Sequence, residues 1–233
     1  MKIDQTYTLK NISTGENKIK VIVYQNKKET ILNQKIIIFS KNPPKLYSYK
    51  IINEFPHDQQ AYTQGLEFDG DELYESTGLN GKSSLRKISF ENGEIKKNVP
   101  LNQSYFGEGL TIINNKIIQL TWKSKIGFVY DKTTMDLKSS FQYKESTEGW
   151  GLCNDGEFLY KSDGTNKIWK LDPNSYQEIS YIEVYTNKSK LNKLNELEWV
   201  NGDIYANTYQ FNKDVVVIIN PVNGSVKGVV DFS

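Results

Sequence analysis

A block of 14 residues occurs four times in this chain without an insertion, and it constrains the fold more than any other feature. The copies begin 44, 42 and 45 residues apart and read GLEFDGDELYESTG (65–78), GLTIINNKIIQLTW (109–122), GLCNDGEFLYKSDG (151–164) and ELEWVNGDIYANTY (196–209). A period of this length, filled with short alternating strands, is typical of β-propeller blades. We therefore expect an all-β fold in which each copy supplies the two innermost strands of a blade.

Turn signals support this reading, because they recur at the same place in every copy. Residues that tolerate a left-handed backbone stand between the two predicted strands, at 69–71, 114–115, 155–156 and 201–202. A third strand and a second turn follow each copy, as at 84–90 and 91–93. No helical period is sustained in this part of the chain.

The repeats leave one predicted strand over. Four whole repeats run from about residue 60 to Ser233, and the strand predicted at 46–55 has no repeat of its own. A terminal strand often completes the last blade of a propeller. We therefore interpret 45–233 as a C-terminally truncated propeller, with four full blades plus one strand of a blade whose other strands lie beyond Ser233.

Residues 1–44 follow a different pattern. Ile19, Val21 and Val23 occupy alternate positions after a predicted turn at 15–17, and a second turn is predicted at 26–28. Asn42-Pro43-Pro44 reads as a linker. We interpret this segment as part of a small Ig-like β-sandwich joined by a linker to the propeller.

Composition excludes several classes of function. The net charge of +1 gives no basic field for nucleic acid, and no apolar run is long enough to span a membrane. The first residues are too polar for a signal peptide, which leaves the compartment open. Cys153 is the only cysteine and His57 the only histidine, so we expect no internal disulfide, no Cys/His zinc site and no cofactor.

The register of the repeat predicts a site at one end of the propeller axis. The residues directly before the four blocks are Gln64, Glu108, Trp150 and Asn195, while Trp122 and Tyr209 end two of the returning strands. Paired strands are antiparallel, so these ends meet at one mouth, with Phe106 and Tyr62 two residues before an inner strand. Catalysis, ligand binding and plain packing all remain open from the repeat alone.

Three other polar positions receive a structural reading. Glu75 is a weaker candidate acid that we interpret as structural; its equivalents Gln119, Lys161 and Ala206 share no chemistry with it. His57 is interpreted as a hydrogen-bonded loop anchor rather than a proton shuttle, and Cys153 as a core residue.

Six short motifs resemble those of plant-type and bacterial glutaminyl cyclases, over roughly residues 50–232. They are Pro56-His57-Asp58 with Ala61-Tyr62-Thr63-Gln64-Gly65-Leu66, Tyr74-Glu75-Ser76-Thr77-Gly78-Leu79, Ser104-Tyr105-Phe106-Gly107-Glu108-Gly109-Leu110, Gly149-Trp150-Gly151-Leu152, Ser162-Asp163-Gly164-Thr165 and Leu194-Asn195-Glu196-Leu197-Glu198. The resemblance implies a five-bladed propeller that converts N-terminal glutamine to pyroglutamate with release of ammonia. It also implies a metal-independent, periplasmic or secreted bacterial enzyme whose partners are peptides with N-terminal glutamine.

The resemblance assigns roles to matched positions only. Glu108 corresponds to the catalytic acid/base, and the pocket residues correspond to Gln64, Tyr62, Phe106, Trp122, Trp150, Asn195 and Tyr209. Tyr62 and Tyr209 stand where Phe and Trp are usual in the family. The family's closing Leu-Asn-Gly-Ile-Ala and Thr-Gly-Lys motifs do not occur before Ser233.

The hypothesised mechanism needs one carboxyl group. Glu108 would take a proton from the attacking α-amine and give one to the leaving nitrogen, with its pKa raised by partial desolvation among aromatic rings. The amides of Gln64 and Asn195 would stabilise the oxyanion. We expect a monomer. The alternative is a non-catalytic propeller that binds peptide N-termini in the same mouth.

Overall fold

The protein is all-β wherever its structure is described. The computed structural model describes residues 6–209 and 214–232. All the regular secondary-structure elements in those ranges are β-strands. No helix that could cross a membrane is found in the described part of the chain.

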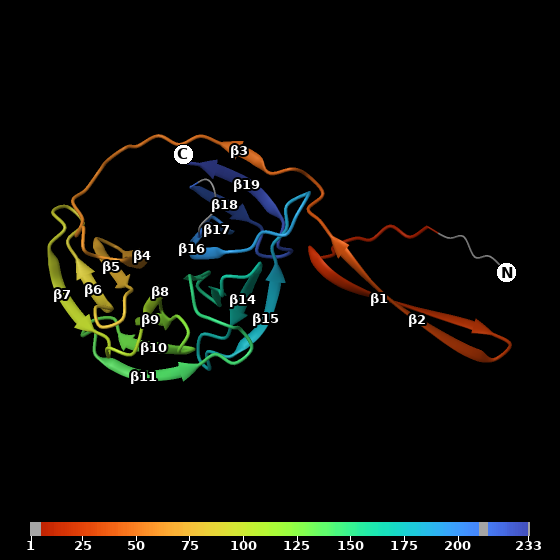
Figure 1. The fold of residues 1–233 in the computed structure, drawn as a ribbon, viewed down its shortest axis with the longest axis horizontal. Helices are drawn as coiled ribbons and strands as arrows, with labels where there is room; N and C mark the ends of the chain where they lie inside the picture. Colours follow the sequence, from red (N-terminus) through yellow and green to blue (C-terminus); the bar gives the residue numbers. More distant parts are fainter. Residues whose placement is uncertain (1–5, 210–213, 233) are drawn as a thin grey trace.

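Four antiparallel four-stranded blades are arranged around a common axis (Figure 1). Blade 1 is β4 (Thr63–Asp69), β5 (Glu72–Thr77), β6 (Ser84–Ile88) and β7 (Ile95–Pro100); blade 2 is β8 (Gly107–Ile113), β9 (Lys116–Thr121), β10 (Ile126–Asp131) and β11 (Leu137–Gln142); blade 3 is β12 (Leu152–Asn154), β13 (Leu159–Ser162), β14 (Lys167–Leu171) and β15 (Glu178–Glu183); blade 4 is β16 (Leu194–Val200), β17 (Asp203–Thr208), β18 (Val215–Ile219) and β19 (Val226–Asp231). In each blade the first strand is innermost and the other three follow outward in chain order, with β3 (Lys45–Tyr47) added outside β19 in blade 4, which confirms the four-blade reading of the repeat.

The predicted left-handed turns are present between the two inner strands of the blades. Asn114 and Asn115 have φ of 49° and 60°, and Asn201 and Gly202 have 51° and 86°. These residue types adopt that backbone at low cost, so they close the two-residue connections of blades 2 and 4.

Three apolar clusters hold the blades together, one at each junction between neighbouring blades. Leu85 and Leu110 belong to the cluster between blades 1 and 2, and Leu120 and Leu159 to the cluster between blades 2 and 3. Cys153 is 2% exposed in the third cluster, between blades 3 and 4, as the core reading predicts. Each blade is thus stabilised mainly by burial against the next.

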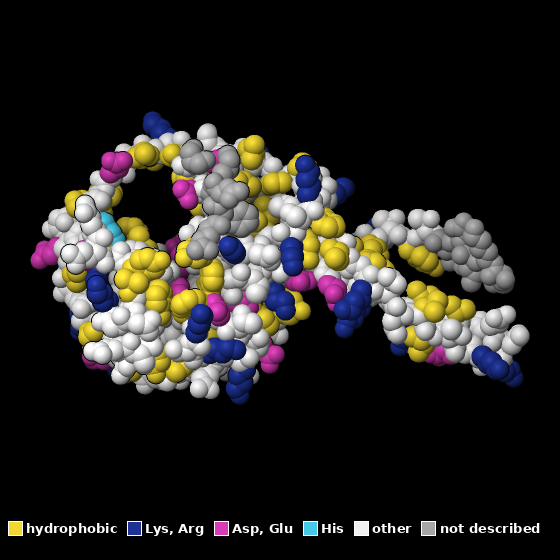
Figure 2. Space-filling view, viewed as in Figure 1, with side chains coloured by type: hydrophobic (Ala, Val, Ile, Leu, Met, Phe, Trp, Pro, Cys, Tyr) yellow, Lys and Arg dark blue, Asp and Glu magenta, His cyan; other side chains and the backbone are white. Residues whose placement is uncertain are grey.

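Blades 1 and 4 do not meet in the same way. The inner strands β4, β8, β12 and β16 pack in sequence, but β16 and β4 share no comparable contact within the described ranges. Figure 2 shows an opening at this place, and in Figure 1 the segment after β3 (Lys45–Tyr47) runs around its outer side. Rings anchor this segment at both ends, Tyr49 against Phe232 on blade 4 and Phe55 against Phe90 on blade 1.

The predicted strand at 46–55 is wrong for most of its length. Only Lys45–Tyr47 is a strand, and it pairs in parallel with β19 at the outer edge of blade 4. Residues 48–55 are not in a strand. A strand needs a hydrogen-bonding neighbour, and within the described structure this stretch crosses the opening, where none is available.

The N-terminal segment forms a long hairpin of β1 (Gly15–Gln25) and β2 (Lys28–Ile38) that projects from the propeller (Figure 1). The predicted turn at 26–28 is confirmed by positive φ at Asn26 and Lys27, whereas the predicted turn at 15–17 is wrong because β1 begins at Gly15. The backbone N–H of Glu16 donates to the Glu183 carboxylate at 2.7 Å and ties the base of the hairpin to blade 3. No third described strand pairs with this hairpin, so the sandwich stays a prediction.

Candidate active site

Three of the four residues that precede the repeated blocks lie at β-bulges. The pairing register shifts between Thr63 and Gly65, between Gly107 and Leu110, and between Leu194 and Leu197. Gln64, Glu108 and Asn195 therefore lie at points where the ladder is interrupted and the strand bends. A bulge at a strand end redirects a side chain from the sheet face, and here the redirected side chains are two amides and a carboxyl.

The glycine that opens three of the blocks has a packing reason. A Cβ on Gly65 would lie 2.6 Å from the backbone N of Leu110, and one on Gly151 would lie 2.1 Å from the backbone O of Asn195. Inner strands of successive blades thus approach so closely that only glycine fits. Glu196 holds the equivalent position in blade 4, on the side where the ring is open.

The eight site residues predicted from the sequence all line a single cavity of about 300 Å³. Its lining is Tyr62, Thr63, Gln64, Phe106, Glu108, Trp122, Trp150, Asn195 and Tyr209. Thr63 is the one addition, and its hydroxyl donates to Glu75 at 2.6 Å. The structure therefore brings together side chains from all four blades that are up to about 150 positions apart in the sequence.

Aromatic rings form much of the cavity wall. Phe106 contacts Trp122 with ring centroids 5.5 Å apart, and Trp150 meets Tyr209 edge to face at 5.7 Å. Two glycines make room for these rings, since a Cβ on Gly78 would lie 2.5 Å from the ring of Phe106 and one on Gly164 would lie 2.6 Å from that of Trp150. The repeated block thus ends in glycine in blades 1 and 3 and in an aromatic residue in blades 2 and 4, and each of the two glycines leaves room for a ring of the cavity wall.

Glu108 is the most strongly perturbed acid of the cavity. It is 6% exposed, and no hydrogen bond to its carboxyl group is found among the described residues. Burial, and secondarily the charge of Glu148, raise the pKa of Glu108 to about 9. Its carboxyl group is therefore protonated at neutral pH and can donate as well as accept a proton.

Sequence reasoning missed Glu148, which lies behind the cavity wall. One of its carboxylate oxygens, Oε2, accepts a hydrogen bond from the indole N–H of Trp150 at 2.7 Å and another from the indole N–H of Trp122. The repeat could not reveal this contact, because Glu148 lies in a connection between blades. The available signal was a carboxylate two residues before a tryptophan that the repeat placed at the mouth.

The polar residues at the middle of the second strands share a structural role. Gln119 donates to Ser76 Oγ at 2.7 Å, and Lys161 donates to the backbone O of Glu148 at 3.1 Å. Glu75 accepts from His57 at 2.9 Å as well as from Thr63, so the anchor reading of His57 agrees with its contacts. Each of the three buried side chains contacts the neighbouring blade or the loop before its own blade. These contacts agree with the structural reading of Glu75, although the side chains at these positions differ in chemistry.

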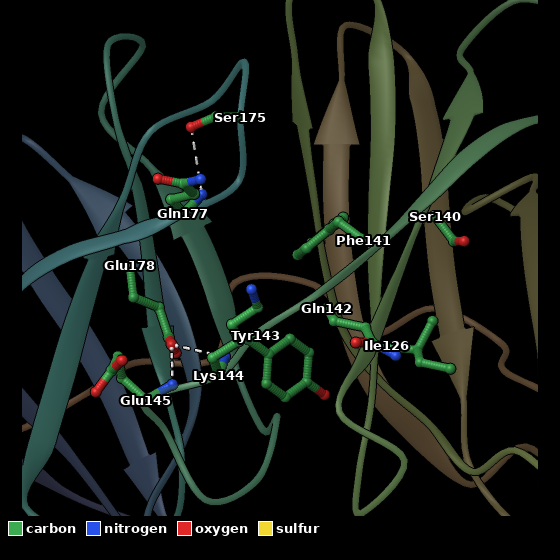
Figure 3. A pocket seen from close by; sticks show the side chains of 10 residues that line it. All are labelled: Ile126, Ser140, Phe141, Gln142, Tyr143, Lys144, Glu145, Ser175, Gln177 and Glu178. Atoms are coloured by element: carbon green, nitrogen blue, oxygen red, sulfur yellow. Dashed lines mark hydrogen bonds between the residues drawn. The ribbon is translucent and has the colours of Figure 1, made fainter.

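A larger cavity, of about 630 Å³, lies between the outer parts of blades 2 and 3 (Figure 3). Glu178 lines this cavity, and its carboxylate accepts hydrogen bonds from the backbone N–H groups of Lys144, Glu145 and Ser146 at 2.7–3.3 Å. Glu178 also pairs with the buried Lys161 at 3.4 Å. Its hydrogen-bonding capacity is used within the protein, so this cavity offers little chemistry to a ligand.

Acidic side chains also gather further along the axis, around a cavity of about 420 Å³ lined by Glu67 and Glu198 among others. Burial raises the pKa of Glu67 to about 7 and raises that of Glu196 as well. No group of three or more His, Cys, Asp and Glu residues in the described ranges is arranged to hold a metal ion.

Comparisons with known proteins agree with the geometry. The sequence model of a family described as glutamine cyclotransferase matches residues 20–233. A curated glutaminyl-peptide cyclotransferase from Arabidopsis thaliana is 38% identical over 180 residues, which are 77% of this chain and 55% of that protein. The chain thus spans little more than half the length of that relative.

Solved structures show the same fold. The crystal structure of Myxococcus xanthus glutaminyl cyclase superposes with a TM-score of 0.73 at 32% identity, covering 81% of this chain and 78% of that one. Hydrazine synthase of Kuenenia stuttgartiensis superposes with a TM-score of 0.51 at 15% identity, covering 79% and 53%, and is similar in fold alone.

Proposed function

The chain belongs to the glutamine cyclotransferase family, and from that premise we propose that it is a glutaminyl-peptide cyclotransferase that uses the cavity around Glu108. The substrates would be peptides or proteins that begin with glutamine. The observation that carries the proposal is the convergence of Gln64, Glu108 and Asn195 with five aromatic rings on a single cavity.

The reaction closes a five-membered ring within the substrate. The neutral α-amine attacks the carbon of its own side-chain amide, the bond from that carbon to the amide nitrogen breaks, and ammonia leaves. One proton must move from the attacking nitrogen to the leaving nitrogen. A single carboxyl group within reach of both can carry it.

Glu108 has the properties that this transfer requires. Because its pKa is about 9, it is protonated in the empty site and can give its proton to the leaving nitrogen. The carboxylate so formed takes the proton released by the attacking amine, which restores the starting state. Glu108 thus acts as acid and then as base, and its raised pKa makes its carboxylate a stronger base in the second step.

The amides and rings would supply the remaining catalysis. The side-chain amides of Gln64 and Asn195 are the donors that we assign to the oxyanion of the tetrahedral intermediate. The aromatic wall would hold the glutamine side chain folded with its amide near its own amine, and such positioning can contribute much of the rate. This mechanism uses neither a metal nor a cofactor, and it needs one copy of the chain.

A fifth blade and an upstream domain belong to the same proposal. We assign the opening between blades 1 and 4 to a fifth blade. Apolar side chains on β4, such as Leu66 and Phe68, are exposed, whereas blades 2 and 3 are each buried between two neighbouring blades. The hairpin would be part of a β-sandwich within residues 1–44, with the propeller domain over 45–233. A two-stranded sheet gains little stability alone, which supports this division.

The decisive experiment is to incubate the protein with a peptide that begins with glutamine and to follow the loss of ammonia by mass spectrometry. We expect conversion well above the spontaneous rate, and none with the N-acetylated peptide, because acetylation removes the nucleophile. Binding of the peptide without ammonia release would overturn the enzymatic proposal and favour a propeller that only captures peptide N-termini.

A further inference from the structure

The connection between blades 2 and 3, residues 143–151, is fixed along its whole length. The hydroxyl of Tyr143 donates to the backbone O of Thr121, and the backbone N–H of Gly149 donates to the backbone O of Trp122 at 3.1 Å. A Cβ on Gly149 would lie 2.7 Å from the Thr121 oxygen, so the connection lies directly against blade 2. These contacts hold the connection against blade 2, although it contains no strand.

A buried cation holds the middle of the same connection. Lys161 is fully buried on β13 and donates to the hydroxyl of Ser146 and to the backbone O of Glu148. Its charge is balanced by Glu178, which in turn receives the backbone N–H groups at 144–146. Burial of a lysine is costly, and we infer that the Lys161–Glu178 pair stabilises one particular conformation of the connection 143–151.

The result of these contacts is the position of one carboxylate. Glu148 is half-buried, and its Oε2 receives both indole N–H groups of the cavity wall, one from blade 2 and one from blade 3. Trp122 follows β9 of blade 2 and Trp150 precedes β12 of blade 3, and each ring also packs against a ring of its own, Phe106 and Tyr209 respectively. A shared charged acceptor fixes both orientations at once, and charge-assisted hydrogen bonds are about twice as strong as neutral ones.

We propose that Glu148 is a positioning residue of this site, whose carboxylate holds the Trp122 and Trp150 rings in place around the substrate. The inference rests on the proposed function for its meaning in catalysis. The contacts that carry it are properties of the free protein.

The positioning role can be tested without substrate. Of the four tryptophans in the chain, two donate to Glu148. In Glu148→Ala we expect the indole N–H resonances of these two to shift in the ¹H–¹⁵N spectrum while the other two stay in place. The matched control is Glu145→Gln, an exposed carboxylate on the same connection, which should move none. Unchanged indole resonances in Glu148→Ala would overturn the positioning role.

These readouts separate the inference from the proposed function. A protein that releases no ammonia but shows the shift of the two indole resonances in Glu148→Ala would leave the assignment of Glu148 intact and contradict the cyclotransferase. A protein that turns over normally as Glu148→Ala would contradict the assignment alone, because we expect at least about a tenfold loss of kcat/KM when the rings are released.

Discussion

Two cavities beside blade 2 each contain a shielded glutamate, and the pKa values of these two glutamates are shifted in opposite directions. Glu178, in the outer cavity of about 630 Å³, has a side chain that is 2% exposed. Although burial acts against it, a hydrogen bond from Ser146 and the charge of Lys161 hold the pKa of Glu178 below its usual value. Glu108, in the axial cavity of about 300 Å³, lacks such partners, and its pKa is about 9.

The difference shows that cavity size does not identify the reactive site. A carboxylate whose oxygens already accept several hydrogen bonds stabilises the fold and has little capacity left for a ligand. A buried carboxyl group without partners costs stability, and proteins retain such groups mainly where the chemistry needs them. On this criterion we assign the proposed site to the smaller cavity and interpret the larger one as a structural joint between blades 2 and 3.

Removing the reactive carboxyl group is expected to have the largest effect. Glu108→Gln should reduce kcat for ammonia release by about 10²–10⁴-fold, because the amide cannot carry a proton between the two nitrogens. Steady-state kinetics with a glutamine-initiated peptide measures this loss. Near-normal turnover in the variant would place the acid/base elsewhere and remove the contrast between the two cavities.

Removing the structural carboxylate should instead lower stability. Glu178→Ala leaves the buried Lys161 without its counter-ion and three backbone N–H groups without an acceptor, and breaking such a pair costs about 3–5 kcal/mol. Chemical denaturation should show this loss, while kcat measured well below the melting temperature changes much less than in Glu108→Gln. A variant as stable as the wild type would show that the outer carboxylate is not a structural joint.

A smaller effect should distinguish the amides of the two cavities. Asn195→Ala removes a donor that we assign to the oxyanion, so kcat should fall by about 10²-fold with little change in stability. Its matched control is Gln142→Ala, which removes an amide that lines the outer cavity. Equal kinetic effects in the two variants would contradict the assignment of oxyanion donors to the axial cavity.

The sequence predicted the axial cavity better than its surroundings, for a physical reason. Phase along a repeat is transmitted through strand pairing, so the positions of Gln64, Glu108, Trp150 and Asn195 follow from counting residues. Glu148 lies in a connection outside that register. Its position depends on Lys161 and Ser146, contacts that no period encodes.

Two other outcomes have the same cause. Residues 48–55 have the composition of a strand, but a strand exists only where a partner runs beside it. The shared role of Glu75, Gln119 and Lys161 was missed because their side chains differ in charge, and only the structure shows that each reaches toward the neighbouring blade or the loop before it. Local composition therefore predicted elements, while long-range contacts decided which of them formed and what their side chains did.

The smallest expected effect is the pH dependence of stability, which has opposite signs in the two cavities. The folded-state pKa of Glu108 lies above the unfolded value of 4.5, so the unfolded chain loses this proton first and stability falls as pH rises from 4.5 to about 9. The folded-state pKa of Glu178 lies below 4.5, so its contribution to stability is present above pH 4.5 and is lost as pH falls through the folded value.

The free energy of unfolding of Glu108→Gln should therefore match that of the wild type near pH 4.5 and exceed it at about pH 9. The expected excess is on the order of 1–2 kcal/mol, because solvent at the cavity mouth screens part of the difference. Unfolding curves of both proteins across this range measure the gap. A difference in stability that does not grow with pH would mean that Glu108 ionises normally in the folded protein. The pKa values of Glu108 and Glu178 would then no longer distinguish the axial cavity from the outer one.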